Sequence, residues 1–233
     1  MSSYCSSERG ARLVALCLWL AASQAGAQTP ESPRAESPDP SRAPAPFREI
    51  IAPLANDTPL GYFIAGADAT VAEGSDAELC AWALDDWVRH AEGRLEVTPA
   101  VEADAVIRIY LVSPGFALYG EMRPILVGDR RGAEVYVRTE TETTGDGANA
   151  AGLDPLMRET IVYLTCLHEI GHALGMLHTD IFDDVMYYFG YGGDTAAFFD
   201  RYRSRLESRA DIAHVSGLSP GDVAQLLRAY PED

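Results

Sequence analysis

Alternating and continuous apolar positions predict several short β-strands in the first two thirds of the chain. The strongest signal covers 105–112, where Val106, Ile107, Ile109 and Leu111 give a run dominated by large and β-branched side chains. Further strands are predicted at 60–65, 95–98, 116–123, 125–127 and 134–138, and glycine-rich turns separate the later ones.

Helical spacing of apolar residues predicts three helices, at 76–92, 155–174 and 220–229. Ser75 with Glu78 three residues later forms a capping box before the first helix. Ser219 followed by Pro220 is the N-cap and first position of the last helix. The order of strands and helices, with no internal repeat, indicates one α+β domain.

Two segments around the long central helix have a different character. Residues 139–152 are polar and predict a loop. Residues 195–209 predict an amphipathic helix with a basic face, which could either cover the core or line a cleft.

The N-terminal residues are typical of a secretory signal followed by a linker. Arg9 and Arg12 precede a short apolar run, and Ala25-Gly26-Ala27 gives a small-residue cleavage site, so 1–27 is predicted to be a signal peptide. The run is shorter than the ~20 residues needed to span a bilayer. An alternative lipoprotein signal at Cys17 is disfavoured because a large leucine precedes it.

Residues 28–48 are rich in Pro, Ser and Ala and predict a disordered linker, so the folded domain is placed at 49–233. A net charge of −17 disfavours nucleic acid and anionic membrane surfaces as partners. The mature chain would keep two cysteines, Cys80 and Cys166, either as one disulfide in an oxidising compartment or as two buried thiols.

Residues 168–178 read HEIGHALGMLH, which is the pattern HExxHxxGxxH. His168 and His172 are four residues apart and therefore project from one face of a helix, within reach of one ion. Glu169 is placed to touch a metal-bound water instead of the metal. Gly175 can adopt the positive φ that ends a helix, which lets His178 return as a third ligand. Three imidazoles leave a fourth position open, as in a catalytic zinc site.

This motif resembles that of the metzincin clan of zinc metalloendopeptidases. Met186 matches the clan's methionine turn, and its short distance from His178 resembles the matrixins, as does the segment from Leu218 into the last helix. The sequence departs from matrixins because it has no upstream cysteine switch, and His90 and His214 are too few for a further structural zinc site. Tyr188 instead resembles the tyrosine of astacins and serralysins, which assists catalysis; a packing role is the alternative.

The resemblance implies a metzincin-like zincin fold. Its twisted, mostly parallel sheet has an antiparallel edge strand and packs on two long helices, with a further helix at the C-terminus. The implied function is that of a secreted endopeptidase with one Zn²⁺ on His168, His172 and His178, a metal-activated water, and Glu169 as general base. An extended protein or peptide substrate would pair with an edge strand at 116–123 or 125–127.

Other readings stay open beside this one. A secreted binding or adhesion module could keep the fold without cleaving, although an intact Glu169 disfavours it. Calcium could bind Asp180, Asp183 and Asp184, or the acidic residues of the polar loop, but their spacing matches no known calcium loop. The sequence predicts no stable membrane insertion, and it gives no indication of the oligomeric state.

Overall fold

The computed structural model describes residues 52–65, 74–112, 119–139 and 154–232. The predicted signal peptide at 1–27, the linker at 28–48 and nearly all of the polar loop at 139–152 lie outside these residues. Within the described ranges, no helix has the length and hydropathy needed to cross a bilayer.

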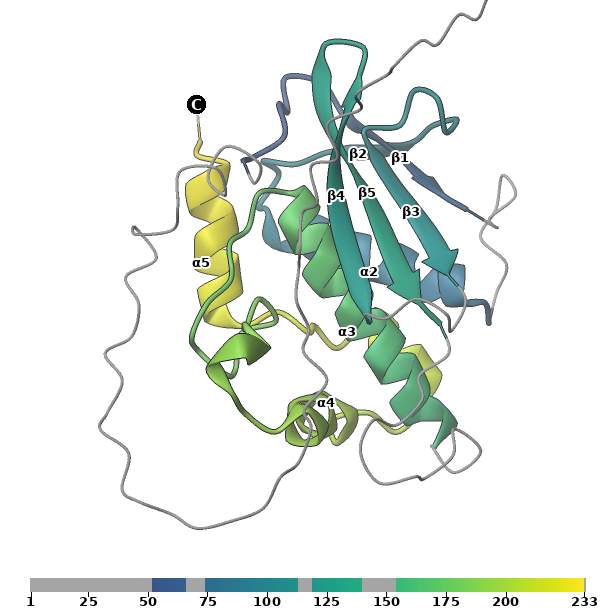
Figure 1. Cartoon of the computed structure of the whole chain (residues 1–233), viewed down its shortest axis with the longest axis vertical. Coiled ribbons are helices and arrows are strands. Elements are labelled where there is room, and N and C mark those ends of the chain that lie inside the picture. The colour runs from purple at the N-terminus through teal and green to yellow at the C-terminus, as the bar shows by residue number, and fades with distance from the viewer. Residues whose placement is uncertain (1–51, 66–73, 113–118, 140–153, 233) are drawn as a thin grey trace, which may run out of the picture.

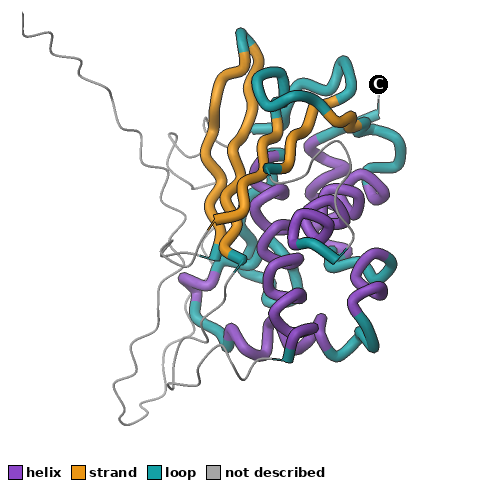
Figure 2. Tube along the Cα trace, turned by 90° about the vertical axis from the view of Figure 1, so that its right-hand side faces the viewer, coloured by secondary structure: helices purple, strands orange, loops and turns teal. Residues whose placement is uncertain are grey.

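A five-stranded sheet forms one layer of the molecule and the helices form the other (Figure 2). The strands are β1 (Leu60–Ile64), β2 (Val97–Pro99), β3 (Ile107–Val112), β4 (Gly120–Val127) and β5 (Arg130–Arg138). Their order is β2-β1-β3-β5-β4, in which only β4 runs antiparallel to its neighbour (Figure 1). This is the expected mostly parallel sheet with an antiparallel edge strand.

The prediction of two separate strands on either side of Pro124 is wrong. One strand, β4, passes through this proline and pairs with β5 across a two-residue turn in which Gly128 has φ +60°. Ala133 lies opposite Pro124 and donates its N–H to Val106 on the other side of β5. The nitrogen of Pro124 therefore faces the open edge of the sheet, where a missing N–H breaks no ladder bond.

The described helices are α2 (Asp76–His90), α3 (Pro155–Ala173), α4 (Thr195–Arg203) and α5 (Pro220–Ala229). The N-caps predicted at Ser75 and Ser219 are both present, and each side chain accepts a hydrogen bond from the backbone N–H three residues later. α3 packs against both the sheet and α2 and is buried along almost its whole length. Figure 1 shows α3 running alongside β4.

The helix predicted at 195–209 ends early, at Arg203. Asp211 accepts hydrogen bonds from the N–H groups of Glu207 and Ser208, both at 2.8 Å, and this begins a separate 3-10 turn at Arg209–Ala213. Phe198, Phe199 and Tyr202 of α4 are buried. Of the two roles considered for this segment, the helix therefore covers the core.

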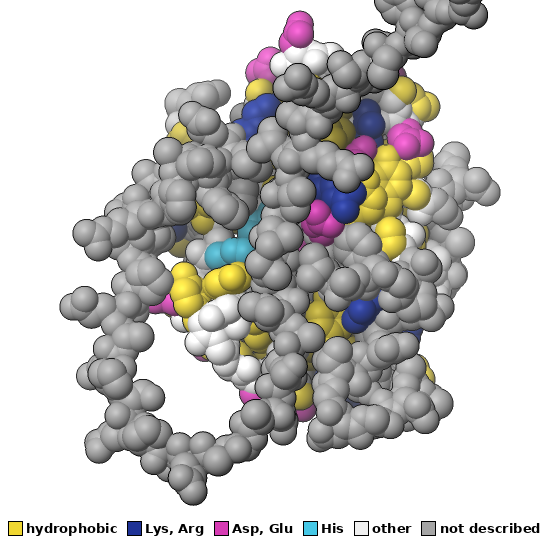
Figure 3. All heavy atoms as spheres, viewed as in Figure 1, with side chains coloured by type: hydrophobic (Ala, Val, Ile, Leu, Met, Phe, Trp, Pro, Cys, Tyr) yellow, Lys and Arg dark blue, Asp and Glu magenta, His cyan; other side chains and the backbone are white. Residues whose placement is uncertain are grey.

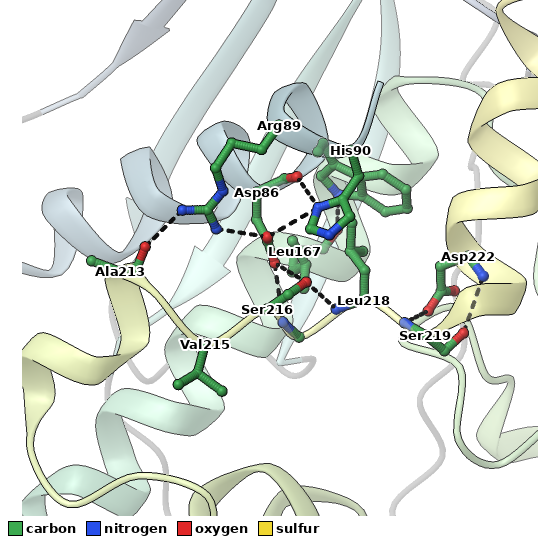
Figure 4. A network of polar contacts seen from close by, with 12 residues as sticks. Asp86, Arg89, His90, Leu167, Ala213, Val215, Ser216, Leu218, Ser219 and Asp222 are labelled. Atoms are coloured by element: carbon green, nitrogen blue, oxygen red, sulfur yellow. Dashed lines mark hydrogen bonds and ion pairs between the residues drawn. The ribbon is translucent and has the colours of Figure 1, made fainter. Parts of the chain in front are cut away.

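A disulfide and a buried carboxylate tie α3 to its surroundings. Cys80 of α2 and Cys166 of α3 form a disulfide with Cα atoms 5.3 Å apart. The carboxylate of Asp86, fully buried on α2, accepts hydrogen bonds from Tyr163 at 2.7 Å, from the Ser216 hydroxyl at 2.9 Å and from the Gly217 N–H at 3.0 Å. Figure 4 shows how this carboxylate holds the segment that leads into α5.

Candidate metal centre

The end of α3 and the turn after it bring the three predicted histidine ligands together. His168 and His172 lie one turn apart near the end of α3, and both are buried. Gly175 follows the helix with φ +95°, and a Cβ at this position would lie 2.5 Å from the Pro53 nitrogen. Only glycine fits both conditions, so the chain turns here and carries His178 back towards α3.

The Nε2 atoms of the three imidazoles converge on one point. Nε2 of His178 lies 3.1 Å from that of His172 and 3.3 Å from that of His168. These three residues form a group that could hold a metal ion, with all ligand atoms within 4.8 Å of one another. No other group of three or more candidate ligands occurs among the described residues.

Backbone carbonyls fix which nitrogen of two imidazoles carries the proton. Nδ1 of His168 lies 2.7 Å from the Val185 oxygen, and Nδ1 of His172 lies 2.9 Å from the Met176 oxygen. Because a carbonyl can only accept, each Nδ1 must donate, which leaves the Nε2 lone pair free for a metal.

Burial keeps the imidazoles neutral, which is the state that binds a metal. It lowers the pKa of His168 to about 3 and that of His172 to about 4, and it also lowers the pKa of His178. The mutual repulsion of the charged forms adds to the effect at His168 and His178. The donor set is therefore three neutral nitrogen ligands, which suits zinc.

The predicted methionine turn lies against the helix that carries the ligands. Met186 is fully buried, and a Cβ on Gly171 of α3 would lie only 2.5 Å from its sulfur. Thr179 donates its N–H to the Met186 oxygen at 2.9 Å and accepts from the Tyr188 N–H at 3.0 Å. These bonds join the segment after His178 to the turn.

Glu169 is buried beside the first ligand, against the edge strand β4. Its carboxylate accepts a hydrogen bond from the Met122 N–H, whereas Oε2 is buried with no hydrogen-bond partner among the described residues. The pKa of Glu169 is raised to about 8: burial is the largest cause, the nearby Glu121 adds to it, and the hydrogen bond from Met122 opposes both. One oxygen is thus anchored, and the other is available to a ligand.

Gly120 and the Met122 N–H complete the seat of Glu169, and neither could be predicted from the motif. A Cβ on Gly120 would lie 2.6 Å from Cγ of Glu169 and 2.7 Å from Cγ2 of Thr165. β4 can approach α3 this closely because residue 120 has no side chain. The sequence offered only a glycine within a strand, which is a weak sign of close backbone approach.

Tyr188 lies beside the third histidine. Its ring centroid is 4.9 Å from that of His178, with the two planes tilted by 35°. Tyr191 packs edge-on against the ring, and Gly190 leaves room for it, because a Cβ there would lie 2.1 Å from the ring. The side chain is half-buried, and its hydroxyl has no hydrogen-bond partner in the described part of the chain.

Two of the three aspartates predicted as possible calcium ligands have protein partners. Asp183 pairs with Arg201 at 2.9 Å, and Asp184 accepts a hydrogen bond from the Ser219 hydroxyl. Asp180 is exposed. The acidic residues of the polar loop at 140–152 lie outside the described residues.

The three-histidine cluster reaches the molecular surface beside the edge strand β4. Figure 3 shows histidine side chains at the surface on this face, next to hydrophobic ones. The aromatic rings of Phe182, Tyr187, Phe189 and Phe198 meet edge-on nearby.

Comparisons with known proteins give only distant structural similarity. No protein-family model matches the chain, and no curated protein matches it. One solved structure of myroilysin is similar, with a TM-score of 0.41 and 14% identity, over 82% of this chain and 88% of that one. A second myroilysin structure gives a TM-score of 0.38 and 15% identity, over 80% and 93% of the two chains.

Proposed function

We propose that this chain is a secreted zinc-dependent endopeptidase of the metzincin type. The observation that carries the proposal is the convergence of three neutral Nε2 donors next to a buried glutamate with one unpartnered oxygen. A purely structural metal site needs no such carboxylate, whereas hydrolysis needs a base beside the metal. The methionine turn, the edge strand and the C-terminal helix support the same assignment.

The ion would be held by His168, His172 and His178 through Nε2. When bound, zinc polarises a carbonyl and lowers the pKa of water towards 7. The positive charge of the bound ion would lower the pKa of Glu169 and keep its carboxylate ionised. Oε2 of Glu169 would then accept a proton from the attacking water and deliver it to the nitrogen of the departing amine. The Met122 N–H would keep the carboxylate oriented during both transfers.

The open edge of β4 would bind the substrate as an added strand. Pro124 and Met122 lie at alternate positions whose backbone nitrogens face away from β5, on the side of the metal centre. The backbone carbonyls of the same residues also face this edge and can accept hydrogen bonds from an extended peptide. The Tyr188 hydroxyl would donate a hydrogen bond to the substrate oxygen on which negative charge develops.

The subtype we propose combines two metzincin groups. The short connection from His178 to Met186 is matrixin-like, whereas Tyr188 is astacin-like. Secretion is supported by the signal sequence predicted at 1–27 and by the disulfide between Cys80 and Cys166, which is typical of oxidising compartments.

Replacing Glu169 by Gln tests the proposal because the amide keeps the shape of the side chain but cannot take up the proton. We expect wild type and Glu169→Gln to bind one zinc per chain by elemental analysis. Only wild type should cleave a mixed peptide library, with kcat/KM at least about 100-fold above the variant. Zinc in both proteins with cleavage in neither would instead favour the non-cleaving binding module.

A further inference from the structure

We propose that α5 is a positioning element for the metal ligands, in which Asp222 and Gln225 act on His168 and His172 through one peptide group each. The inference rests on the proposed function, because it assigns roles to residues that support the metal site. Neither residue belongs to the HExxHxxGxxH motif, and the hydrogen bonds of both side chains go to the backbone instead of to an imidazole.

The first connection runs from Asp222 to His168 through the peptide group that joins Val185 and Met186. The N–H of this group, on Met186, donates to Oδ1 of Asp222 at 3.2 Å. Its carbonyl, on Val185, accepts the Nδ1 proton of His168 at 2.7 Å. Asp222 also accepts from the Val185 N–H at 2.9 Å and is fully buried. The Ser219 N–H is a third backbone donor to Asp222, so this side chain acts only as an acceptor in these bonds.

The second connection runs from Gln225 to His172 through the peptide group that joins Met176 and Leu177. The Leu177 N–H donates to Oε1 of Gln225, and the carbonyl of the same group accepts the Nδ1 proton of His172 at 2.9 Å. Nε2 of Gln225 also donates to the Leu177 oxygen at 3.1 Å. The Gln225 amide therefore bonds to both the N–H and the carbonyl oxygen of Leu177, the residue before His178.

The two connections share one design. A peptide group whose N–H donates to an acceptor becomes more polarised, so its carbonyl accepts more strongly. A stronger carbonyl holds the proton on Nδ1 and increases the electron density at Nε2, as other partners of ligand histidines do. Asp222 and Gln225 are three residues apart and therefore lie on one face of α5.

Contacts that do not involve the three histidines fix the position of α5, so the helix can orient the ligands. Ser219 and Asp222 form a reciprocal capping box at its first turn, drawn in Figure 4. At its end, the Tyr230 hydroxyl accepts from the Leu54 N–H and donates to the Leu174 oxygen, both at 3.0 Å. The segment before α5 is fixed by the buried Asp86.

The test compares Asp222→Asn and Gln225→Ala with two variants that weaken α5 elsewhere. Ser219→Ala removes the capping hydroxyl. Tyr230→Phe removes two hydrogen bonds, with the Leu54 N–H and the Leu174 oxygen, neither of which involves a metal ligand. In the full chain, chelator competition should show zinc affinity falling about tenfold in Asp222→Asn and severalfold in Gln225→Ala. The zinc affinity of both control variants should stay within about twofold of wild type, even where they reduce the stability of the zinc-free protein as much as the two test variants do.

A second readout follows the imidazole tautomers by ¹⁵N NMR of the zinc-free protein, with assigned histidine rings. Asp222→Asn should move His168 away from the pure Nδ1–H form and leave His172 unchanged, and Gln225→Ala should do the reverse. Equal effects of the four variants on affinity, or tautomers that do not follow this crossed pattern, would overturn the proposal. If Asp222→Asn does not fold, the half-buried Gln225 decides the test through His172 alone.

This design separates the two proposals. A wild-type chain that binds no zinc would contradict the proposed function, and the tautomer pattern of the zinc-free protein would still decide the role of α5. A wild-type chain that binds zinc and cleaves peptides, with variants that behave like the controls, would contradict only the positioning role.

Discussion

Neighbouring hydrogen-bond partners decide which atom of a buried imidazole or carboxyl group carries a proton, and so which atom can bind a ligand. At the metal centre, carbonyl oxygens of Val185 and Met176 do this for His168 and His172. Glu169 has one anchored oxygen and one without a partner. Tyr188 differs from all of these, because its hydroxyl has no partner among the described residues. It is thus the residue whose role depends most on the substrate.

Replacing Tyr188 by Phe distinguishes catalysis from packing. If the hydroxyl stabilises the developing charge, kcat should fall by about 10- to 100-fold with KM nearly unchanged, because the interaction forms only in the transition state. Zinc content should stay at that of wild type. A rise in KM with unchanged kcat would instead identify Tyr188 as part of the pocket wall; steady-state kinetics on one cleaved peptide decides between them.

Residue spacing alone was enough to predict the histidine cluster, since positions four apart on a helix and a glycine turn are local features. His168, His172 and His178 lie together as expected, and Gly175 has the predicted positive φ. Gly120 and Asp222 could not be predicted in the same way. Their contacts depend on how β4 and α5 approach α3, and this is set by packing between segments far apart in sequence.

At the scale of secondary structure, the open edge of β4 and the end of α3 build the site together. The helix boundaries that depend on local caps, at Ser75 and Ser219, were predictable. Pro124 misled the prediction because a proline normally interrupts a strand, and only the position of β4 at the sheet edge makes it harmless. The segment after α4 is held by Asp211, eight residues beyond the end of the helix, which accepts hydrogen bonds from the Glu207 and Ser208 N–H groups.

Gly120→Ala tests the close approach of β4 to α3. The added methyl group would collide with Glu169, so the carboxylate or the strand must shift. We expect kcat/KM to fall at least tenfold, because misplacement of about 1 Å strongly reduces catalysis, while zinc binding is kept. Leu126→Ala is the matched control, since Leu126 is on the same strand and 72% exposed. Equal activity of the two variants would show that Gly120 does not seat the base.

At the scale of the whole molecule, burial of the site links its chemistry to folding. Unfolding returns three imidazoles to water, where their pKa is about 6.5. The folded pKa values of His168 and His172 are lower, so the stability that these groups contribute is present above pH 6.5 and lost as the pH falls. Glu169 has the opposite effect on stability, because its folded pKa is raised to about 8 and the folded chain keeps a proton that the unfolded chain releases. This effect involves one proton, whereas the imidazoles involve three.

We therefore expect the zinc-free protein to lose stability as the pH falls from 7 to 5.5. Below pH 6.5 the unfolding free energy should decrease by about 2 kcal/mol for each unit by which the pH falls. The reason is that the unfolded chain takes up protons on three imidazoles, whereas the folded chain holds one extra proton on Glu169. Denaturant unfolding at several pH values measures this slope. His172→Met, which removes one buried imidazole, should reduce it, and a slope of zero or of opposite sign would show that the histidines are not buried and neutral.

A zinc titration of the chelator-treated full chain, followed by cleavage of a mixed peptide library, tests most directly whether this chain is a zinc-dependent endopeptidase. We expect no cleavage without metal, activity that rises in proportion to added zinc, and saturation at one zinc per chain. Cleavage that persists in the zinc-free protein, or one bound zinc without cleavage of any peptide, would contradict this assignment.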